Sequence, residues 1–458
     1  MTVKSGSFGT AKGDHTSGIY VGGRGGGTQT MARSAKVEGG YIYNLIGGPI
    51  SATTRGTVND IYIYQTGGTI DMVIGGAGTT ATYGNRIVSL TGGMVGYSAF
   101  GGSNGYNAGT GDGMITGSSF IYVGGNVQVG NPTYVTGNSN LFGAEAGSVF
   151  GIGNGNEASS NIGSCDNSTI IIDGNADVLR NVYGGGNYGG VASTTSTTLL
   201  TPQTKINVLS GKIRGDIYGA GNRAGSGNTT RISTITINMS GGQVLGNIYG
   251  GSNITGTVYG TTNINVLEGL VGKNVYGGGK GGVGSTGNFI ARNVNVIIGS
   301  STQSPNINGN VYGGSAFGSV NGTANSATLS GYTTNVTVHN GNILGAVFGG
   351  AEGNTTYTPY VMGPVTVNIN GGDIGYVYGG NDQAGVPNGT GTVLVYLNGG
   401  IIGESYGGGN RVRVPVTKIY LQGSETGLLF GGSNVLGNID ETNVMVTSRN
   451  SIPCVWRK

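Results

Sequence analysis

Charged residues, cysteine, histidine and proline are all scarce in this chain of 458 residues. Charged residues make up 9% of it, against about 25% in ordinary globular proteins. A net charge of +3 leaves no basic surplus to neutralise phosphates, which argues against a nucleic-acid-binding protein. No apolar stretch reaches the ~20 residues that span a bilayer, so membrane insertion is not expected.

The few residues with metal-binding or redox chemistry are widely separated. His15 and His339 stand alone, and no histidine–cysteine cluster has zinc spacing, so we predict no metal and no cofactor. Cys165 and Cys454 are too few for a disulfide framework, and we predict that they do not pair with each other. The 9 prolines and the lack of a Gly-X-Y period exclude collagen.

Glycine and tyrosine are abundant instead, with 100 and 25 residues respectively. Glycine costs roughly 1 kcal/mol per helix position relative to alanine, so a helical protein is not expected. The 36% hydrophobic content is enough to bury a core, which argues against plain disorder. We therefore expect an ordered fold that is not predominantly helical.

One phrase recurs along the chain: a glycine pair, a short apolar segment, an aromatic residue and a second glycine pair. Its aromatic or aliphatic position returns roughly every 31 residues. It falls at Val21, Ile46, Ile74, Phe100, Phe150, Tyr183, Tyr218, Tyr249, Tyr276, Tyr312, Phe348, Tyr378, Tyr406 and Phe430. The long gap before Phe150 predicts an insertion within about residues 103–148, and leaves Phe142 as an alternative aligned aromatic.

A second repeated element, such as Thr234–Ile237 or Asn263–Val266, alternates apolar and polar residues and is followed by a glycine turn. This pattern is typical of a half-buried strand. The remaining length varies and is rich in Gly, Ser, Thr and Asn, as expected for loops that leave one edge of a stack. The sequence predicts an all-β fold: a parallel β-helix of about fourteen coils, forming one domain over residues 1–458.

Two columns of like residues follow from such a stack. The first is a ladder of amides four places after the aromatic position, at Asn104, Asn154, Asn187, Asn222, Asn253, Asn410 and Asn434. Stacked asparagines suit tight corners and can hydrogen-bond from coil to coil, so we favour a structural ladder over a line of ligand-binding amides.

The second column is aromatic and unbroken from Phe100 to Phe430. In residues 213–218, Ile213 and Ile217 share one parity, and Tyr218 shares the other with Arg214. Strict alternation would place the aromatics outside, as an exposed ridge for binding or assembly. The aromatic touches a Gly-Gly turn, however, where alternation can break, and a buried tyrosine stack is the alternative.

Nineteen carboxylates offer few candidates for catalysis. Glu352 and Asp382 occupy the same position in successive coils, and Asp373 and Glu404 lie on neighbouring coils. Two carboxylates about 5 Å apart can hydrolyse glycosides. Neighbouring acids are expected by chance in such a stack, so we predict no catalytic residue, with a polysaccharide-degrading enzyme as a lesser alternative.

The phrases Asn181–Asn187 and Glu404–Asn410 resemble the glycine-rich repeats of bacterial surface and adhesin-type β-solenoid proteins. The resemblance implies a secreted or surface-displayed rod, and it carries over no catalytic residue. We expect a non-enzymatic structural or adhesive protein that associates with itself, end to end or laterally, with surface glycans as a further candidate partner. A phage tail-fibre or virion component is the alternative. An extracellular or cell-surface location is expected, although the first residues contain no apolar signal segment.

Overall fold

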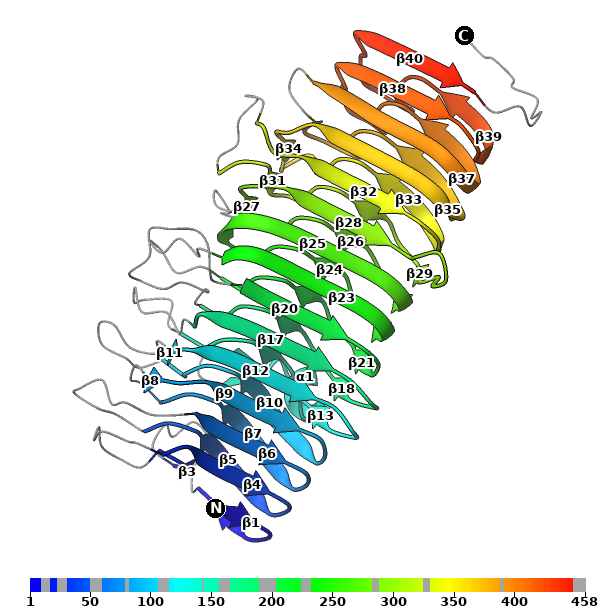
Figure 1. The fold of residues 1–458 in the computed structure, drawn as a ribbon. Coiled ribbons are helices and arrows are strands. Elements are labelled where there is room, and N and C mark those ends of the chain that lie inside the picture. The colour runs from blue at the N-terminus through cyan, green and yellow to red at the C-terminus, as the bar shows by residue number, and fades with distance from the viewer. Residues whose placement is uncertain are drawn as a thin grey trace. The chain divides into compact units, whose positions relative to one another are not determined.

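The computed structural model describes residues 1–9, 17–22, 31–49, 60–78, 82–105, 115–141, 144–155, 165–188, 203–223, 232–281, 288–323, 330–387 and 391–447. They form two compact units: Met1–Ile235 with Gly242–Leu245 (unit 1), and Thr236–Gly241 with Gly246–Lys458 (unit 2). Each unit is a parallel β-helix, in which a strand pairs with its equivalents in the coils before and after it (Figure 1). The predicted fold class is confirmed.

The described residues of unit 1 form three rows of parallel strands. Figure 1 shows how the strands of successive coils stack on one another. The long row comprises β1 (Thr2–Val3), β4 (Arg33–Val37), β6 (Ile61–Gln65), β9 (Arg86–Leu90), β12 (Ser118–Val123), β17 (Asn167–Ile172) and β20 (Gln203–Val208). The second row comprises β2 (Ser7–Phe8), β5 (Tyr41–Ile46), β7 (Thr69–Ile74), β10 (Met94–Phe100), β13 (Gln128–Val129), β18 (Asp177–Val178) and β21 (Lys212–Ile213). The third, aromatic row comprises β3 (Ile19–Tyr20), the ends of β5, β7 and β10, β16 (Val149–Phe150), β19 (Val182–Tyr183) and β22 (Ile217–Tyr218).

Unit 2 repeats this arrangement with longer strands, several of which continue through two rows. The long row comprises β25 (Gly256–Val271), β28 (Val294–Ile298), β32 (Thr334–Val338), β35 (Val365–Tyr378), β37 (Thr392–Tyr406), β38 (Val416–Leu421) and β40 (Glu441–Val446). The other rows contain β24 (Ile248–Tyr249), β26 (Val275–Tyr276), β29 (Asn306–Ile307), β30 (Val311–Tyr312), β33 (Asn342–Phe348) and β39 (Glu425–Phe430). A fourth row comprises β27 (Asn288–Ile290), β31 (Ser319–Val320), β34 (Tyr360–Val361) and β36 (Val386–Pro387), and β23 (Ile232–Val244) contributes residues to both units.

The core of each unit consists of aliphatic columns that follow directly from the alternating segments. Along β17, Ile170 and Ile172 are fully buried, whereas Thr169 and Ile171, which alternate with them, are half-buried on the outer face. Ile206 of β20 lies in register with Ile170, so like residues stack from coil to coil. Each coil is too thin to bury its apolar side alone, and the stack supplies the missing neighbours.

A glycine column at the corner after each aromatic residue lets the coils approach. A Cβ added to Gly313 would overlap the carbonyl oxygen of Gly349 in the next coil, and the same holds for Gly277 against Gly313. The corner carbonyls also accept buried hydroxyls: Thr262 Oγ1 donates to Gly277 O at 2.8 Å. Glycine is therefore required here because any side chain would collide with the backbone above it.

Strand register refines the predicted repeat. Phe150 pairs with both Phe100 and Tyr183, so it is the aligned aromatic, as predicted. In the first copy Tyr20, rather than the predicted Val21, pairs with Ile46.

The predicted insertion lies between β13 and β16. It contains α1 (Pro132–Thr136), which is capped by the Asn131 side chain, and the antiparallel pair β14 (Asn140–Leu141) and β15 (Ala144–Glu145). A separate parallel pair in unit 1 is formed by β8 (Thr82–Tyr83) and β11 (Ile115–Thr116). Within the part of the chain that the structure describes, no helix is long and apolar enough to cross a membrane.

Candidate functional site

The aromatic column is buried, which corrects the expectation of an exposed binding or assembly ridge. From Phe100 to Tyr406 each ring is at most 5% exposed, and only Phe430 is half-buried. Successive rings stack with centroids 4.7 to 5.0 Å apart, along Phe100, Phe150, Tyr183 and Tyr218 in unit 1 and along Tyr249, Tyr276, Tyr312, Phe348, Tyr378, Tyr406 and Phe430 in unit 2. The column is therefore a core element, as in the alternative interpretation.

The short length of the aromatic strands explains why strict alternation placed the aromatic side chains on the outer face rather than in the core. Ile213 is buried and Arg214 exposed, as alternation requires, but the following strand β22 has only two residues and ends at a glycine bend. Ile217 and Tyr218 are both buried there. Side chains alternate only along extended backbone, and a corner breaks that rule.

The tyrosine hydroxyls are held by polar residues from two directions. Asn274 Nδ2 donates to the Tyr276 hydroxyl at 2.8 Å, and Asn310 makes the same bond to Tyr312 at 2.9 Å. On the other side, Tyr276 donates to Glu352 Oε2 at 2.6 Å, 76 residues further along the chain. Burial raises the pKa values of Tyr276 and Tyr312 above the usual range, which keeps both hydroxyls protonated as donors.

The predicted asparagine ladder is present as hydrogen bonds between coils. In unit 1 each side-chain amide donates to the Oδ1 of the preceding one at 2.8 to 3.2 Å, along Asn104, Asn154, Asn187 and Asn222. In unit 2, Asn434 donates to Asn410 at 3.1 Å, and Asn410 donates to Asp382 Oδ1 at 2.7 Å. Asn253 is half-buried in the same position of unit 2. The hydrogen bonds support the structural interpretation of this column.

Glu352 and Asp382 occupy the ladder position in consecutive coils, as their backbones confirm: Asp382 N donates to Ala351 O at 2.9 Å. Tyr312 donates to Asp382 Oδ2 at 3.0 Å, and Gln383 Nε2 donates to Asp382 Oδ1 at 2.6 Å. Burial raises the pKa of Glu352 above its ordinary value of 4.5; the hydrogen bond from Tyr276 opposes this shift, and the negative charge of Asp382 adds to it. The two acids are thus integrated into the buried hydroxyl and amide ladders.

The burial of Glu352 predicts a pH-dependent effect of Glu352→Gln. Because the folded-state pKa is raised, the stability that this group contributes is complete below pH 4.5 and is lost as pH rises through the folded value. Glutamine keeps an acceptor for Tyr276 without a charge. We expect the stability of Glu352→Gln relative to the parent protein to increase from pH 4 to pH 8, measured by urea denaturation.

Glu425, an exposed carboxylate on β39, provides the control. Glu425→Gln should show no comparable increase over the same pH range. A stability difference for Glu352→Gln that is constant with pH would contradict the inferred penalty for the buried charge.

Among the residues that the structure describes, the other candidate acids, Asp373 and Glu404, and His339 are not brought together. Asp373 pairs with Ile401, whereas Glu404 pairs with Tyr376, so the two acids lie at different positions along the coil. The exposed His339 side chain is hydrogen-bonded to the side chain of Asn370, through Nδ1 at 3.3 Å. Among the described residues, no three His, Cys, Asp or Glu side chains gather to hold a metal ion.

Cys165 is buried with a free thiol, and burial raises its pKa to about 12. A thiol with so high a pKa is a poor nucleophile at neutral pH. Cys454 and His15 lie outside the described residues.

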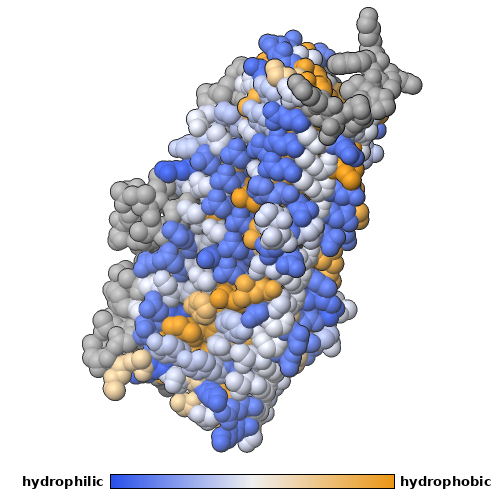
Figure 2. All heavy atoms as spheres, turned by 45° about the vertical axis from the view of Figure 1, so that its right-hand side comes forward, coloured by the Kyte–Doolittle hydropathy of each residue, from blue (hydrophilic) through white to orange (hydrophobic). Residues whose placement is uncertain are grey.

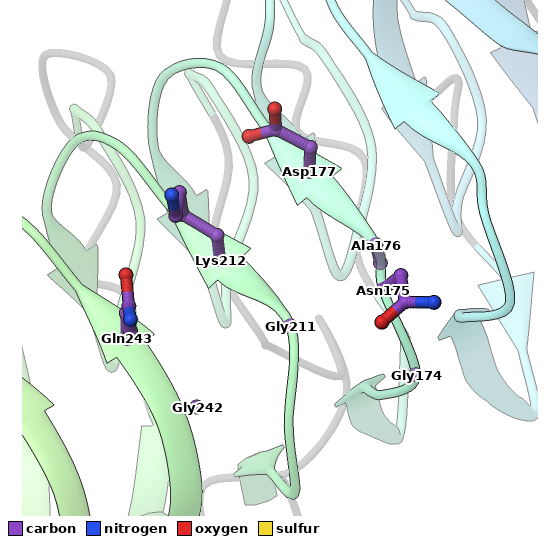
Figure 3. Close-up of a pocket in the computed structure, with 8 residues that line it drawn as sticks. All are labelled: Gly174, Asn175, Ala176, Asp177, Gly211, Lys212, Gly242 and Gln243. Atoms are coloured by element: carbon purple, nitrogen blue, oxygen red, sulfur yellow. The ribbon is translucent and has the colours of Figure 1, made fainter.

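A hollow of about 490 Å³ lies on the surface of unit 1, where three successive coils turn (Figure 3). The turns contain Gly174, Gly211 and Gly242, all with positive φ, and the lack of side chains there opens the hollow. Asp177, Lys212 and Gln243 extend from successive strands beside it. Arg214 binds Asp177 through two nitrogens, at 2.7 and 2.9 Å, so the carboxylate at this rim is already paired.

A second hollow of about 400 Å³ lies on the outer strand face of unit 2. Its lining includes an amide ladder in which Asn295 donates to Asn263 at 2.9 Å and Asn335 donates to Asn295 at 3.1 Å. Here too, amides are hydrogen-bonded to one another along the stack. Both hollows follow from the regular coil geometry.

A cluster of outward-facing apolar side chains, missed by the sequence analysis, lies on the long strands of unit 1. We call it the aromatic platform, and it consists of Tyr62, Tyr64, Ile87, Phe120, Tyr122 and Ile171. Tyr64 is 38% exposed and the others are half-buried. Figure 2 shows hydrophobic residues among hydrophilic ones on the face in view, at the level of β9, β12 and β17 in Figure 1.

The signal for this platform was present in the sequence. Tyr62 and Tyr64 occupy the outward positions of β6, whose other residues, Ile61, Ile63 and Gln65, are buried. Polar residues are expected at outward positions, so aromatics there mark an unusual surface. No family model, curated protein or solved structure matches this chain.

Proposed function

We propose that this protein is a non-enzymatic structural or adhesive protein of the cell surface or extracellular space, whose solenoid coils associate end to end. The proposal agrees with the resemblance of its glycine-rich phrases to bacterial adhesin-type β-solenoids. The observation that carries it is the exposure of the last coil that the structure describes in unit 2, which we call the final coil.

The final coil exposes residues whose equivalents are buried one coil earlier. Val446 is 44% exposed, whereas Leu421, its partner in register, is 5% exposed. Phe430 is half-buried, whereas Tyr406 beneath it is 5% exposed. A coil from a second copy of the chain would cover the apolar surface at Val446 and the ring of Phe430, which supports an end-to-end contact.

Backbone groups point to the same contact. Among the described residues, β40 pairs only with β38, and β39 only with β37, so one edge of each is unpaired. In the first described coil, β1 pairs with β4 and with no other strand of the described ranges. Unpaired parallel edges are templates for another chain, and a head-to-tail contact that does not close produces a filament.

Leu436→Lys tests this contact. Leu436 of the final coil is 62% exposed, so a lysine there should leave the fold intact while placing a charge in the junction. We expect the parent protein to form concentration-dependent linear assemblies, seen by sedimentation velocity and negative-stain electron microscopy, and Leu436→Lys to weaken them.

Leu344, on β33, is also 62% exposed and provides a matched control. Leu344→Lys should leave assembly unchanged, and a larger effect of this variant would indicate lateral association instead. A protein that stays monomeric at high concentration would overturn self-assembly, and a closed trimer would favour the virion-fibre alternative. Antibody labelling of intact producing cells tests the proposed location.

A further inference from the structure

The aromatic platform presents two parallel rows of side chains across neighbouring strands. Tyr62, Ile87 and Phe120 are in register in one row. Tyr64, Ser89, Tyr122 and Ile171 are in register in the other. Neighbouring strands lie about 4.8 Å apart, so the side chains of each row are close neighbours and form one continuous strip.

Fixed carboxylates border this apolar surface. Tyr122 donates to Asp173 Oδ2 at 3.0 Å, and Ser210 donates to Asp173 Oδ1 at 2.8 Å. Asp60 accepts the Asn85 backbone N–H at 2.7 Å and lies 3.5 Å from the Tyr62 hydroxyl. The rings are therefore placed beside oriented acceptors that have lone pairs remaining for a ligand's hydroxyl groups.

The charges near the platform favour a neutral ligand. Lys36, on the neighbouring strand β4, is paired with Glu38 at 2.6 Å. Arg86, which interacts electrostatically with Asp60, is fully buried and does not face a ligand on the surface. An acidic ligand would meet Asp60 and Asp173 directly. Like charges brought together at an interface oppose binding.

The size of the platform argues against a second copy of the chain as its occupant. A stable protein–protein interface buries about 800 Å² on each partner. Six side chains, five of them half-buried, expose much less than that. A ligand with flat apolar faces and hydroxyl edges, only a few rings long, fits this surface better.

We propose that the aromatic platform binds neutral polysaccharides, with pyranose rings stacked on Tyr64 and Tyr122 and sugar hydroxyls donating to Asp60 and Asp173. Tyrosine suits this role because it offers a rigid apolar face and a polar tip. The inference gives the adhesive part of the proposed function a ligand and rests on that part, but it does not depend on end-to-end association.

Affinity gel electrophoresis of the full chain tests the inference, with a β-glucan, a mannan, an α-glucan and the acidic polygalacturonate as probes. We expect at least one neutral polysaccharide to retard the parent protein, and Tyr64→Ala and Tyr122→Ala each to weaken its binding roughly tenfold. Tyr64→Phe keeps the ring and should retain most of the binding. Tyr332, which is 39% exposed in unit 2, is the matched control, and Tyr332→Ala should bind as the parent does.

Three results would overturn the inference: no retardation by any neutral probe, retardation unaffected by both platform variants, or a preference for polygalacturonate. Circular dichroism and thermal unfolding of each variant exclude loss of the fold as the cause. Sedimentation of the Tyr64→Ala/Tyr122→Ala variant separates the two proposals, because it should assemble end to end as the parent does. Reduced self-association of that variant, without glycan binding by the parent, would assign the platform to a second copy instead.

Discussion

Gly313→Ala is expected to lower the free energy of unfolding by more than about 4 kcal/mol, or to prevent folding of unit 2 altogether. The added Cβ would overlap the carbonyl oxygen of Gly349 and would lie 2.7 Å from Thr334 Cγ2 and 2.9 Å from Val336 Cγ2. The backbone cannot move away freely, because Gly313 N donates to Phe348 O at 2.9 Å. Relief would require separating two coils and breaking their ladder of hydrogen bonds.

Gly331→Ala is the control for this prediction, because nothing lies within 4 Å of the Cβ that it would add. Its free energy of unfolding should change by less than about 0.5 kcal/mol. Urea denaturation followed by circular dichroism and tyrosine fluorescence measures both variants. If Gly313→Ala proved as stable as Gly331→Ala, the glycine column would reflect composition rather than a steric requirement.

Tyr312→Ala is expected to cost about 3 to 5 kcal/mol, the range typical of deleting a large buried aromatic side chain. The Tyr312 ring is 1% exposed and stacks between Tyr276 and Phe348, each 4.9 Å away between centroids. Its removal would leave a cavity in the column and would deprive Asp382 and Asn310 of a hydrogen-bond partner. The same urea denaturation measures the loss.

Two further variants separate packing from hydrogen bonding at this position. Tyr312→Phe keeps the stack and removes only the hydroxyl, so we expect a smaller loss of about 1 to 2 kcal/mol. Tyr332→Ala removes a tyrosine that is 39% exposed and should cost less than about 1 kcal/mol. Equal losses for Tyr312→Ala and Tyr312→Phe would mean that the hydroxyl network, not the ring stack, stabilises the column.

The chain sequence by itself determined the coil repeat, the alternating strands and the asparagine ladder. These features depend on residues that are close in sequence or that return once per coil, as Asn187 does after Asn154. In a parallel stack, residues that recur once per coil come into contact with each other. The spacing of the repeat alone therefore predicts Asn–Asn hydrogen bonds and aliphatic residues in register.

Only the tertiary structure decided which way the aromatic column faces and what surrounds it. The turn of the chain at each glycine corner buries Tyr218 beside Ile217, against the parity of the strand before it. The hydrogen bond from Tyr276 to Glu352 joins residues that are 76 positions apart in the sequence, and no local sequence pattern predicts such a contact. Alternation is reliable along an extended strand such as β6, where Tyr64 faces outward, and fails where the backbone bends.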